Sequence, residues 1–226
     1  MRVERVALYY APQTTDPLWD RAAVWLGRDA ASDTPRSQPD LPGMPEITAE
    51  PARYGFHATL KPPMRLRPGV SWEHLVGAVA DIAGAIAPFA LPGLDVADIH
   101  GFLALRESRR CPQLQALADA CVAGADDLRQ PPDAAELARR RRKPLPPDQE
   151  AMLVRWGYPY VFATWFFHMT LTRRLTEAES ACYRPAAEAF FQPVRNLPRR
   201  VSDICDFVQS EPDGAFSLAE RMPLRG

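Results

Sequence analysis

Two stretches of the chain repeat one four-residue pattern, His-x-Thr-Leu. They are His57-Ala58-Thr59-Leu60 and His168-Met169-Thr170-Leu171, and a phenylalanine precedes each histidine. The chain has four histidines, and the other two, His74 and His100, lack the pattern. Side chains alternate between the two faces of a strand, so the His and the Thr of each motif point the same way. Two such strands would aim two imidazoles and two hydroxyl groups into one cleft.

This set of groups suits the hydrolysis of a cyclic phosphodiester. Such a reaction needs a base that takes a proton from water and an acid that protonates the leaving oxygen. Near neutral pH two imidazoles can fill both roles, one neutral and one protonated. Threonine hydroxyls can donate hydrogen bonds to the non-bridging phosphate oxygens. We predict His57, Thr59, His168 and Thr170 as catalytic residues, and the scheme requires no metal and no cofactor.

The same alternation adds residues to the reactive face of each motif strand. Arg53 and Lys61 share the face of the first histidine, and Phe166 and Thr172 share that of the second. Arg53 or Lys61 would offset developing negative charge, although surface salt bridges are the ordinary role of such residues. Phe166 would stack on the substrate, and so would Tyr158, for which packing in the core is the alternative. We therefore predict these five residues as substrate-binding.

The elements that must position these groups follow from periodicity and from turn residues. Strands are predicted at 3–10, 54–61, 90–96, 99–106, within 161–172, at 203–209 and at 215–222, and helices at 16–28, 71–87, 111–129 and 176–191. Thr176 with Glu179 has the spacing of a capping box. Pro62 and Pro63 should stop the first motif strand, and residues 33–51 should form a solvated, mobile loop. Each half pairs a long helix with a motif strand, which suggests an internal duplication.

Residues 130–149 differ in composition from the rest of the chain. Prolines bracket a segment with four consecutive arginines at 139–142. We predict an exposed helix or flap there, within a single two-lobed domain that covers residues 1–226. The arginines could contact the phosphates of a nucleic acid or cover the cleft, but a solvated face is the favoured interpretation.

The composition of the chain is that of a soluble globular protein. Its 226 residues are 46% hydrophobic and 24% charged, and the net charge of −1 argues against a general binder of polyanions. Apolar stretches are too short to cross a bilayer and the first residues lack a secretory pattern, so we expect a cytoplasmic protein without a membrane partner. The four cysteines show no close pairing and are expected to be buried free thiols.

At the two motifs the chain resembles the 2H phosphoesterase superfamily, which is named for two H-x-[ST]-hydrophobic motifs. R-Y-G-F-H-A-T-L-K-P-P at 53–63, and R-W-G-Y-P-Y-V at 155–161 before F-H-M-T-L-T at 167–172, are similar to the DUF1045 family. This resemblance implies a bilobal α+β fold with two antiparallel sheets, outer helices and pseudo-two-fold symmetry about a central cleft. It also implies His57 and His168 as acid and base, with Thr59 and Thr170 holding phosphate oxygens.

The resemblance also bears on the substrate. Members of the family are often linked to phosphonate metabolism, which implies a small cyclic sugar phosphate, such as phosphoribosyl cyclic phosphate, or a 2′,3′-cyclic nucleotide. An RNA-binding or RNA-end-processing module that uses the same cleft and the arginines at 139–142 is the alternative. A metallohydrolase would use the histidines as ligands, but no H-x-H, H-E-x-x-H or Cys/His cluster supports a metal site.

Overall fold

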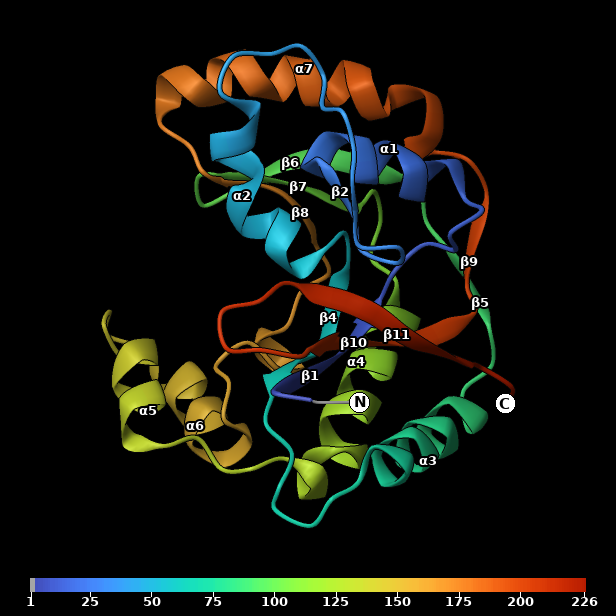
Figure 1. Cartoon of the computed structure of the whole chain (residues 1–226), viewed down its shortest axis with the longest axis vertical. Coiled ribbons are helices and arrows are strands. Elements are labelled where there is room, and N and C mark those ends of the chain that lie inside the picture. Colours follow the sequence, from blue (N-terminus) through green and yellow to red (C-terminus); the bar gives the residue numbers. More distant parts are fainter. Residues whose placement is uncertain (1–2) are drawn as a thin grey trace.

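Seven strands form one antiparallel sheet in the computed structural model, which describes residues 3–226 (Figure 1). The strands of this sheet, in the order β11-β10-β1-β4-β8-β7-β6, are β1 (Arg5–Tyr10), β4 (Ala58–Met64), β6 (Leu94–Ile99), β7 (Phe102–Glu107), β8 (Met169–Arg174), β10 (Asp203–Gln209) and β11 (Phe216–Pro223). Two short ladders pair β2 (Arg28–Asp29) with β3 (Thr34–Pro35) and β5 (Phe89–Leu91) with β9 (Arg199–Val201). The helices are α1 (Pro17–Leu26), α2 (Met44–Tyr54), α3 (Trp72–Gly84), α4 (Pro112–Gly124), α5 (Ala134–Arg140), α6 (Pro147–Trp156) and α7 (Glu177–Arg195), with 3-10 turns η1 (Asp126–Leu128) and η2 (Phe162–Thr164).

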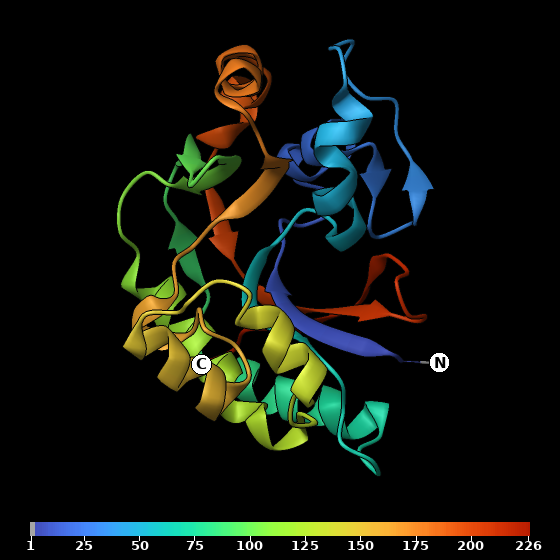
Figure 2. The same ribbon diagram turned by 90° about the vertical axis from the view of Figure 1, so that its left-hand side faces the viewer.

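The sheet consists of two halves that meet at one residue pair. Strands β11, β10, β1 and β4 form one half and β8, β7 and β6 the other, and Ala58 opposite Met169 joins them. Helices α3 and α4 pack on the first half, whereas α1, α2 and α7 pack on the second. Figure 2 shows these two groups of helices at opposite ends of the molecule. The predicted α+β fold, with antiparallel strands and outer helices, is confirmed.

The two faces of the sheet are packed differently. The main apolar core lies between the helices and the sheet and draws on both halves. Trp25 of α1 is fully buried in it, and its indole N–H donates to the carbonyl oxygen of Leu171 at 3.0 Å. On the other face of β1 and β10, a smaller cluster contains Tyr9 and Phe207. We call these the helix face and the cleft face of the sheet.

Several predicted helices and strands are confirmed, together with the capping and turn residues that predicted them. The Ser71 hydroxyl accepts from the backbone N–H of His74 at the start of α3. Thr176 and Glu179 form the expected capping box at the start of α7. Strands β10 and β11 form the predicted hairpin. The four cysteines are free thiols as expected, but only Cys121 and Cys205 are buried, since Cys111 is half-buried and Cys182 is exposed.

Two predictions that relied on proline were wrong. The segment 33–51 is not a mobile loop, because α2 begins at Met44 and buries Ile47, Thr48 and Pro51 along one side. The first motif strand begins at Ala58 and continues through Pro62 and Pro63 to Met64. The pairing of β4 with β1 is irregular at Pro62 and Pro63, and β4 pairs with β8 only at Ala58, before both prolines. No hydrogen bond of the sheet therefore needs the N–H group that each proline lacks.

Asp206 of β10 is a buried carboxyl group on the helix face. It pairs with Leu8 of β1 and has no exposed surface. Neither of its carboxyl oxygens has a hydrogen-bond partner among residues 3–226. Burial, and then the nearby Glu220 carboxylate, raises the pKa of Asp206 to about 8. Asp206 is therefore protonated in the folded protein at neutral pH.

We predict that this group makes the free energy of unfolding fall as pH rises from about 4 to 8. An aspartate in the unfolded chain loses its proton near pH 4. Unfolding therefore releases a proton across this window, and higher pH favours the unfolded state. Asp206→Asn should remove this part of the pH dependence, whereas Asp40→Asn, at an exposed site, should keep it. Urea unfolding at three pH values measures how the free energy of unfolding changes with pH. The same change in wild type and in Asp206→Asn would contradict the prediction.

Candidate active site

The two motifs meet where the halves of the sheet join. Ala58 and Met169 are antiparallel partners, and both side chains are buried in the helix-face core. Around an antiparallel pair the two chains run in opposite directions, so residue 57 lies toward residue 170 and residue 59 toward residue 168. Alternation turns these four side chains to the cleft face. Each histidine thus lies across from the threonine of the other motif.

His57 is held in one orientation by three neighbours. Its Nδ1 is 2.9 Å from the carbonyl oxygen of Gly55, and its Nε2 is 3.2 Å from the Thr59 hydroxyl. The ring stacks on Tyr9 with centroids 3.6 Å apart. Since a carbonyl oxygen only accepts, Nδ1 carries the proton and Nε2 accepts from Thr59. Burial lowers the pKa of His57 to about 4, so the imidazole is neutral at pH 7.

His168 repeats this anchoring. Its Nδ1 is 3.2 Å from the carbonyl oxygen of Phe166, two residues earlier in the chain, as Gly55 is two residues before His57. The ring stacks on Phe166, with centroids 4.7 Å apart. Burial, with a smaller contribution from the Arg106 charge, lowers the pKa of His168. The two imidazoles are close enough that charge on His168 lowers the pKa of His57.

A cavity of about 620 Å³ opens beside the motifs. This volume is typical of small-molecule sites, which span roughly 300–1,000 Å³. His57, Thr59 and Thr170 line it. The lining of this cavity does not include His168 or Phe166, but it includes Phe102, whose ring centroid lies 5.8 Å from that of His168.

Three of the predicted binding residues line the cavity. Arg53 reaches it from the last turn of α2, not from a strand, and its Nη2 is 3.3 Å from a carboxylate oxygen of Asp213. Tyr158 lines it just after α6. Thr172 lies at its edge, where its buried hydroxyl accepts a hydrogen bond from the backbone N–H of Leu103 at 3.0 Å. Thr172 therefore also ties β8 to β7.

Lys61 lies on the helix face, so the predicted alternation is wrong at this residue. Tyr9 pairs with Thr59 but Leu8 pairs with Lys61, which leaves Leu60 as an extra residue in β4. A bulge of this kind shifts the alternation by one. Lys61 consequently shares the face of Leu8 and not that of His57.

The buried Lys61 side chain ties β4 to the end of α4. Its Nζ donates to the carbonyl oxygen of Val122 at 2.9 Å and lies 3.5 Å from Oδ1 of Asp126. The side chain is only 2% exposed. Burial lowers the pKa of Lys61 to about 8 and the Asp126 charge opposes this shift, so the ammonium group is charged at pH 7.

Alternation along the motif strands did not predict two further features of the cavity. Tyr9, which lines it beneath His57, lies on β1, where its face is opposite that of Leu8. Arg139 and Arg140 also line it. Arg140 is largely covered, which corrects its interpretation as part of a solvated face, whereas Arg139 is exposed to solvent as predicted and also borders the cavity. Arg141 fits that interpretation, since it is exposed and pairs with Glu150.

Residues 3–226 lack two features. No group of three or more His, Cys, Asp and Glu side chains in this part of the chain is placed to hold a metal ion. None of the helices described there has the length and apolar character needed to cross a membrane.

We predict that His57 of the folded protein titrates near pH 4 with its proton on Nδ1. A histidine in the unfolded chain takes up this proton near pH 6.5, so the free energy of unfolding falls as pH is lowered from about 6.5 to 4. Correlation spectra of the ring nitrogens in ¹⁵N-histidine protein measure both properties, and His57→Asn identifies the signal. A midpoint near pH 6.5 or an Nε2–H tautomer would contradict the geometry.

We also predict that Lys61→Ala lowers the free energy of unfolding by about 2 kcal/mol, because it removes a buried side chain and leaves the carbonyl oxygen of Val122 without its donor. Asp126 keeps Arg129 as a partner at 2.9 Å. The chain offers a matched control in Lys143→Ala, at an exposed position, which should stay within about 0.5 kcal/mol of wild type. Urea unfolding of both variants measures the difference. Equal stability of the two would show that Lys61 does not secure β4.

Three comparisons with known proteins add to this geometry. The family model described as "Protein of unknown function (DUF1045)" matches residues 59–217. Ribose 1,5-bisphosphate phosphokinase PhnN of Janthinobacterium sp. (strain Marseille) is 38% identical over 231 residues, which cover 98% of this chain and 51% of that protein. The protein of the same name from Laribacter hongkongensis (strain HLHK9) is 34% identical over 216 residues, which cover 95% and 50%. The chain therefore spans about half the length of these curated relatives.

Solved structures share a lower sequence identity with this chain than these relatives do. E. coli LigT in complex with 3′-AMP has a TM-score of 0.48 at 16% identity, with 98% of each chain covered. TT0787 of Thermus thermophilus has a TM-score of 0.48 at 18% identity and the same coverage. On the match of the family model to most of its length, this chain belongs to the DUF1045 family.

Proposed function

We propose that this chain hydrolyses a small cyclic phosphodiester, with His57 and His168 as the acid–base pair and without a metal ion. The observation that carries the proposal is the reciprocal arrangement of two His–Thr pairs around the Ala58–Met169 join. In both histidines Nδ1 is bound to a backbone carbonyl oxygen. This anchoring leaves Nε2 of each ring as the atom for proton transfer.

The proposed reaction is a single displacement at phosphorus. A water oxygen attacks the phosphorus while His57, which burial keeps neutral, takes a proton from the water. One P–O bond of the ring breaks, and its oxygen takes a proton from His168. The product carries a phosphomonoester and a free hydroxyl group. His168 must bind its proton against the effect of burial, and the negative charge of the bound diester would stabilise that protonated form.

The threonines and Arg53 would stabilise the charge that develops on phosphorus. Thr59 and Thr170 line the cavity from opposite motifs. Thr170 can donate its hydroxyl proton to a non-bridging oxygen, and Thr59 can do the same once its hydroxyl turns away from Nε2 of His57, which frees that nitrogen to take a proton from water. Arg53 is partly neutralised by the highly exposed Asp213, a pairing that solvent weakens. Its guanidinium group therefore remains able to attract a phosphate.

The relatives support a phosphorylated ribose as the substrate class. Their name refers to a ribose 1,5-bisphosphate phosphokinase, but this chain contains no Gly-x-x-x-x-Gly-Lys-[Ser/Thr] stretch, the phosphate-binding loop of P-loop kinases. We therefore do not assign phosphokinase activity to it. A cyclic phosphodiester of ribose, formed during phosphonate breakdown, agrees with that name and with the resemblance of both motifs to 2H phosphoesterases.

The arginines around the cavity favour one alternative, an RNA-binding or RNA-end-processing module. Such a module would bind RNA with an affinity that falls steeply as salt concentration rises, because binding would release counterions from the phosphates. Filter binding at several salt concentrations tests it. Absent or salt-insensitive binding would remove this alternative.

We predict that His57→Ala and His168→Ala each lower kcat by about 10²–10⁴-fold, the usual contribution of a general acid or base. The assay uses cyclic sugar phosphates and 2′,3′-cyclic nucleotides, and the release of phosphomonoester is measured. EDTA should leave the wild-type rate unchanged.

The exposed His74 provides the matched control, because His74→Ala should retain the wild-type rate. Circular dichroism and thermal unfolding establish that the variants are folded. Full activity in either motif variant would contradict the proposed pair.

A further inference from the structure

Positive charge is concentrated around the cavity of a chain whose net charge is −1. The lining contains Arg5, Arg53, Arg139, Arg140, Arg173 and Arg174, against two carboxylates, Glu50 and Asp213. A cyclic phosphodiester carries one negative charge. The remaining positive charge indicates a ligand with more negative charge than the reacting group alone.

The two arginines of α5 share one carboxylate. Nη2 of Arg140 is 2.8 Å and Nη2 of Arg139 is 3.9 Å from Oε1 of Glu136. Arg173, by comparison, has Glu179 as a partner of its own at 2.8 Å. The α5 pair therefore keeps about one uncompensated positive charge beside the cavity.

Arg140 is already held in place by its neighbours. Its guanidinium group lies 4.7 Å over the ring of Tyr158, which also lines the cavity. The side chain is only 18% exposed, and its buried Nε has no hydrogen-bond partner within residues 3–226. An arginine restrained by an aromatic ring loses little freedom when it binds a phosphate with its planar donor groups.

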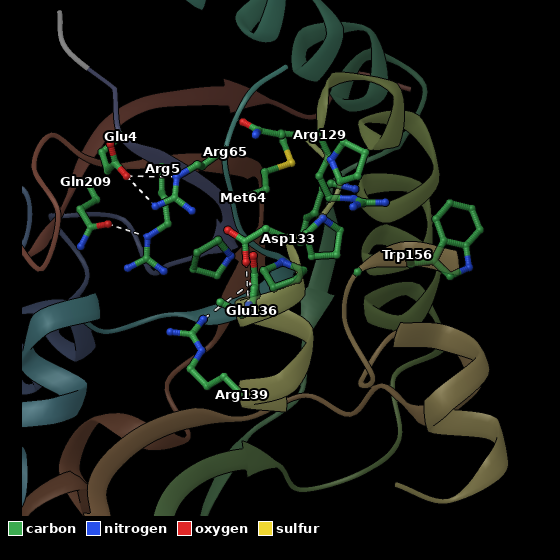
Figure 3. Close-up of a pocket in the computed structure, with 18 of the residues that line it drawn as sticks. Glu4, Arg5, Met64, Arg65, Arg129, Asp133, Glu136, Arg139, Trp156 and Gln209 are labelled. Carbon is green, nitrogen blue, oxygen red and sulfur yellow. Dashed lines mark hydrogen bonds and ion pairs between the residues drawn. The ribbon is translucent and has the colours of Figure 1, made fainter. Parts of the chain in front are cut away.

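Arg5 and Arg139 extend the site into an adjoining cavity of about 400 Å³ (Figure 3). Both cavities are lined by these two residues together with Pro62, Pro63 and the carboxylate of Asp213. Strand residues advance about 3.3 Å each, so Pro62 lies roughly 10 Å along β4 from Thr59. The space thus extends from the motifs toward α5.

We infer that the substrate carries a second phosphate apart from its cyclic diester, and that Arg139 and Arg140 bind it with Arg5 beside them. This inference rests on the proposed function, of which it defines the substrate. A phosphomonoester is close to dianionic at pH 7, which matches two guanidinium groups better than a second diester would.

The test compares two substrates that differ only in the second phosphate, 5-phosphoribose 1,2-cyclic phosphate and ribose 1,2-cyclic phosphate. Wild type should prefer the first in kcat/KM by more than tenfold. In the variant Arg139→Gln/Arg140→Gln this preference should fall by at least about fivefold and approach equal kcat/KM for the two substrates, since charge-assisted hydrogen bonds to the phosphate are lost. The matched control is Arg142→Gln, in the same run of arginines but exposed and in the lining of neither cavity, and it should keep the preference.

The outcomes separate this inference from the proposed function. Equal kcat/KM for both substrates in wild type, or an unchanged preference in the double variant, overturns the inference and leaves the proposed function standing. If neither substrate is hydrolysed, the proposed function fails and calorimetry with ribose 1,5-bisphosphate decides the inference. An affinity at least tenfold weaker in Arg139→Gln/Arg140→Gln than in wild type then supports it, and equal affinities overturn it.

Discussion

The contact between Ala58 and Met169 is the constraint on which the site depends. It joins the halves of the sheet and faces both apolar side chains toward the helices. The residues next to them must then face the opposite way. A slip of one residue would turn the histidines and threonines into the helix-face core and expose Leu60 and Leu171, so the burial of these leucines maintains the register.

The candidate site could be predicted in part because its information is local. In both motifs apolar residues alternate with His and Thr, and this period of two assigns the face of each side chain once the strand is recognised. The capping box at Thr176 and the hairpin between β10 and β11 are local signals of the same kind. These features need only neighbours along the chain, and the fold preserves them.

The remaining features depend on contacts between segments far apart in sequence. The bulge at Leu60 arises from the pairing of β4 with β1, and it moves Lys61 from the cleft face to the helix face. The prolines in residues 33–51 led to the wrong prediction of a loop where α2 forms. The buried residues of this helix, Met44, Ile47, Thr48 and Pro51, nevertheless have helical spacing. The packing of α5 decides which of the arginines at 139–142 reach the cavity. The sequence pattern of residues 130–149 does not indicate how this helix packs.

Two matched His–Thr pairs form a site with approximate symmetry, whereas α5 lies on one side of it (Figure 1). A symmetric pair of imidazoles offers no basis for choosing which of the two ester oxygens leaves the phosphorus. If Arg139 and Arg140 bind a second phosphate as inferred above, they would remove that ambiguity, because a ligand anchored at α5 would enter in one orientation and present one ester oxygen to His168. The position of a short helix outside the sheet would thereby decide the regiochemistry of ring opening.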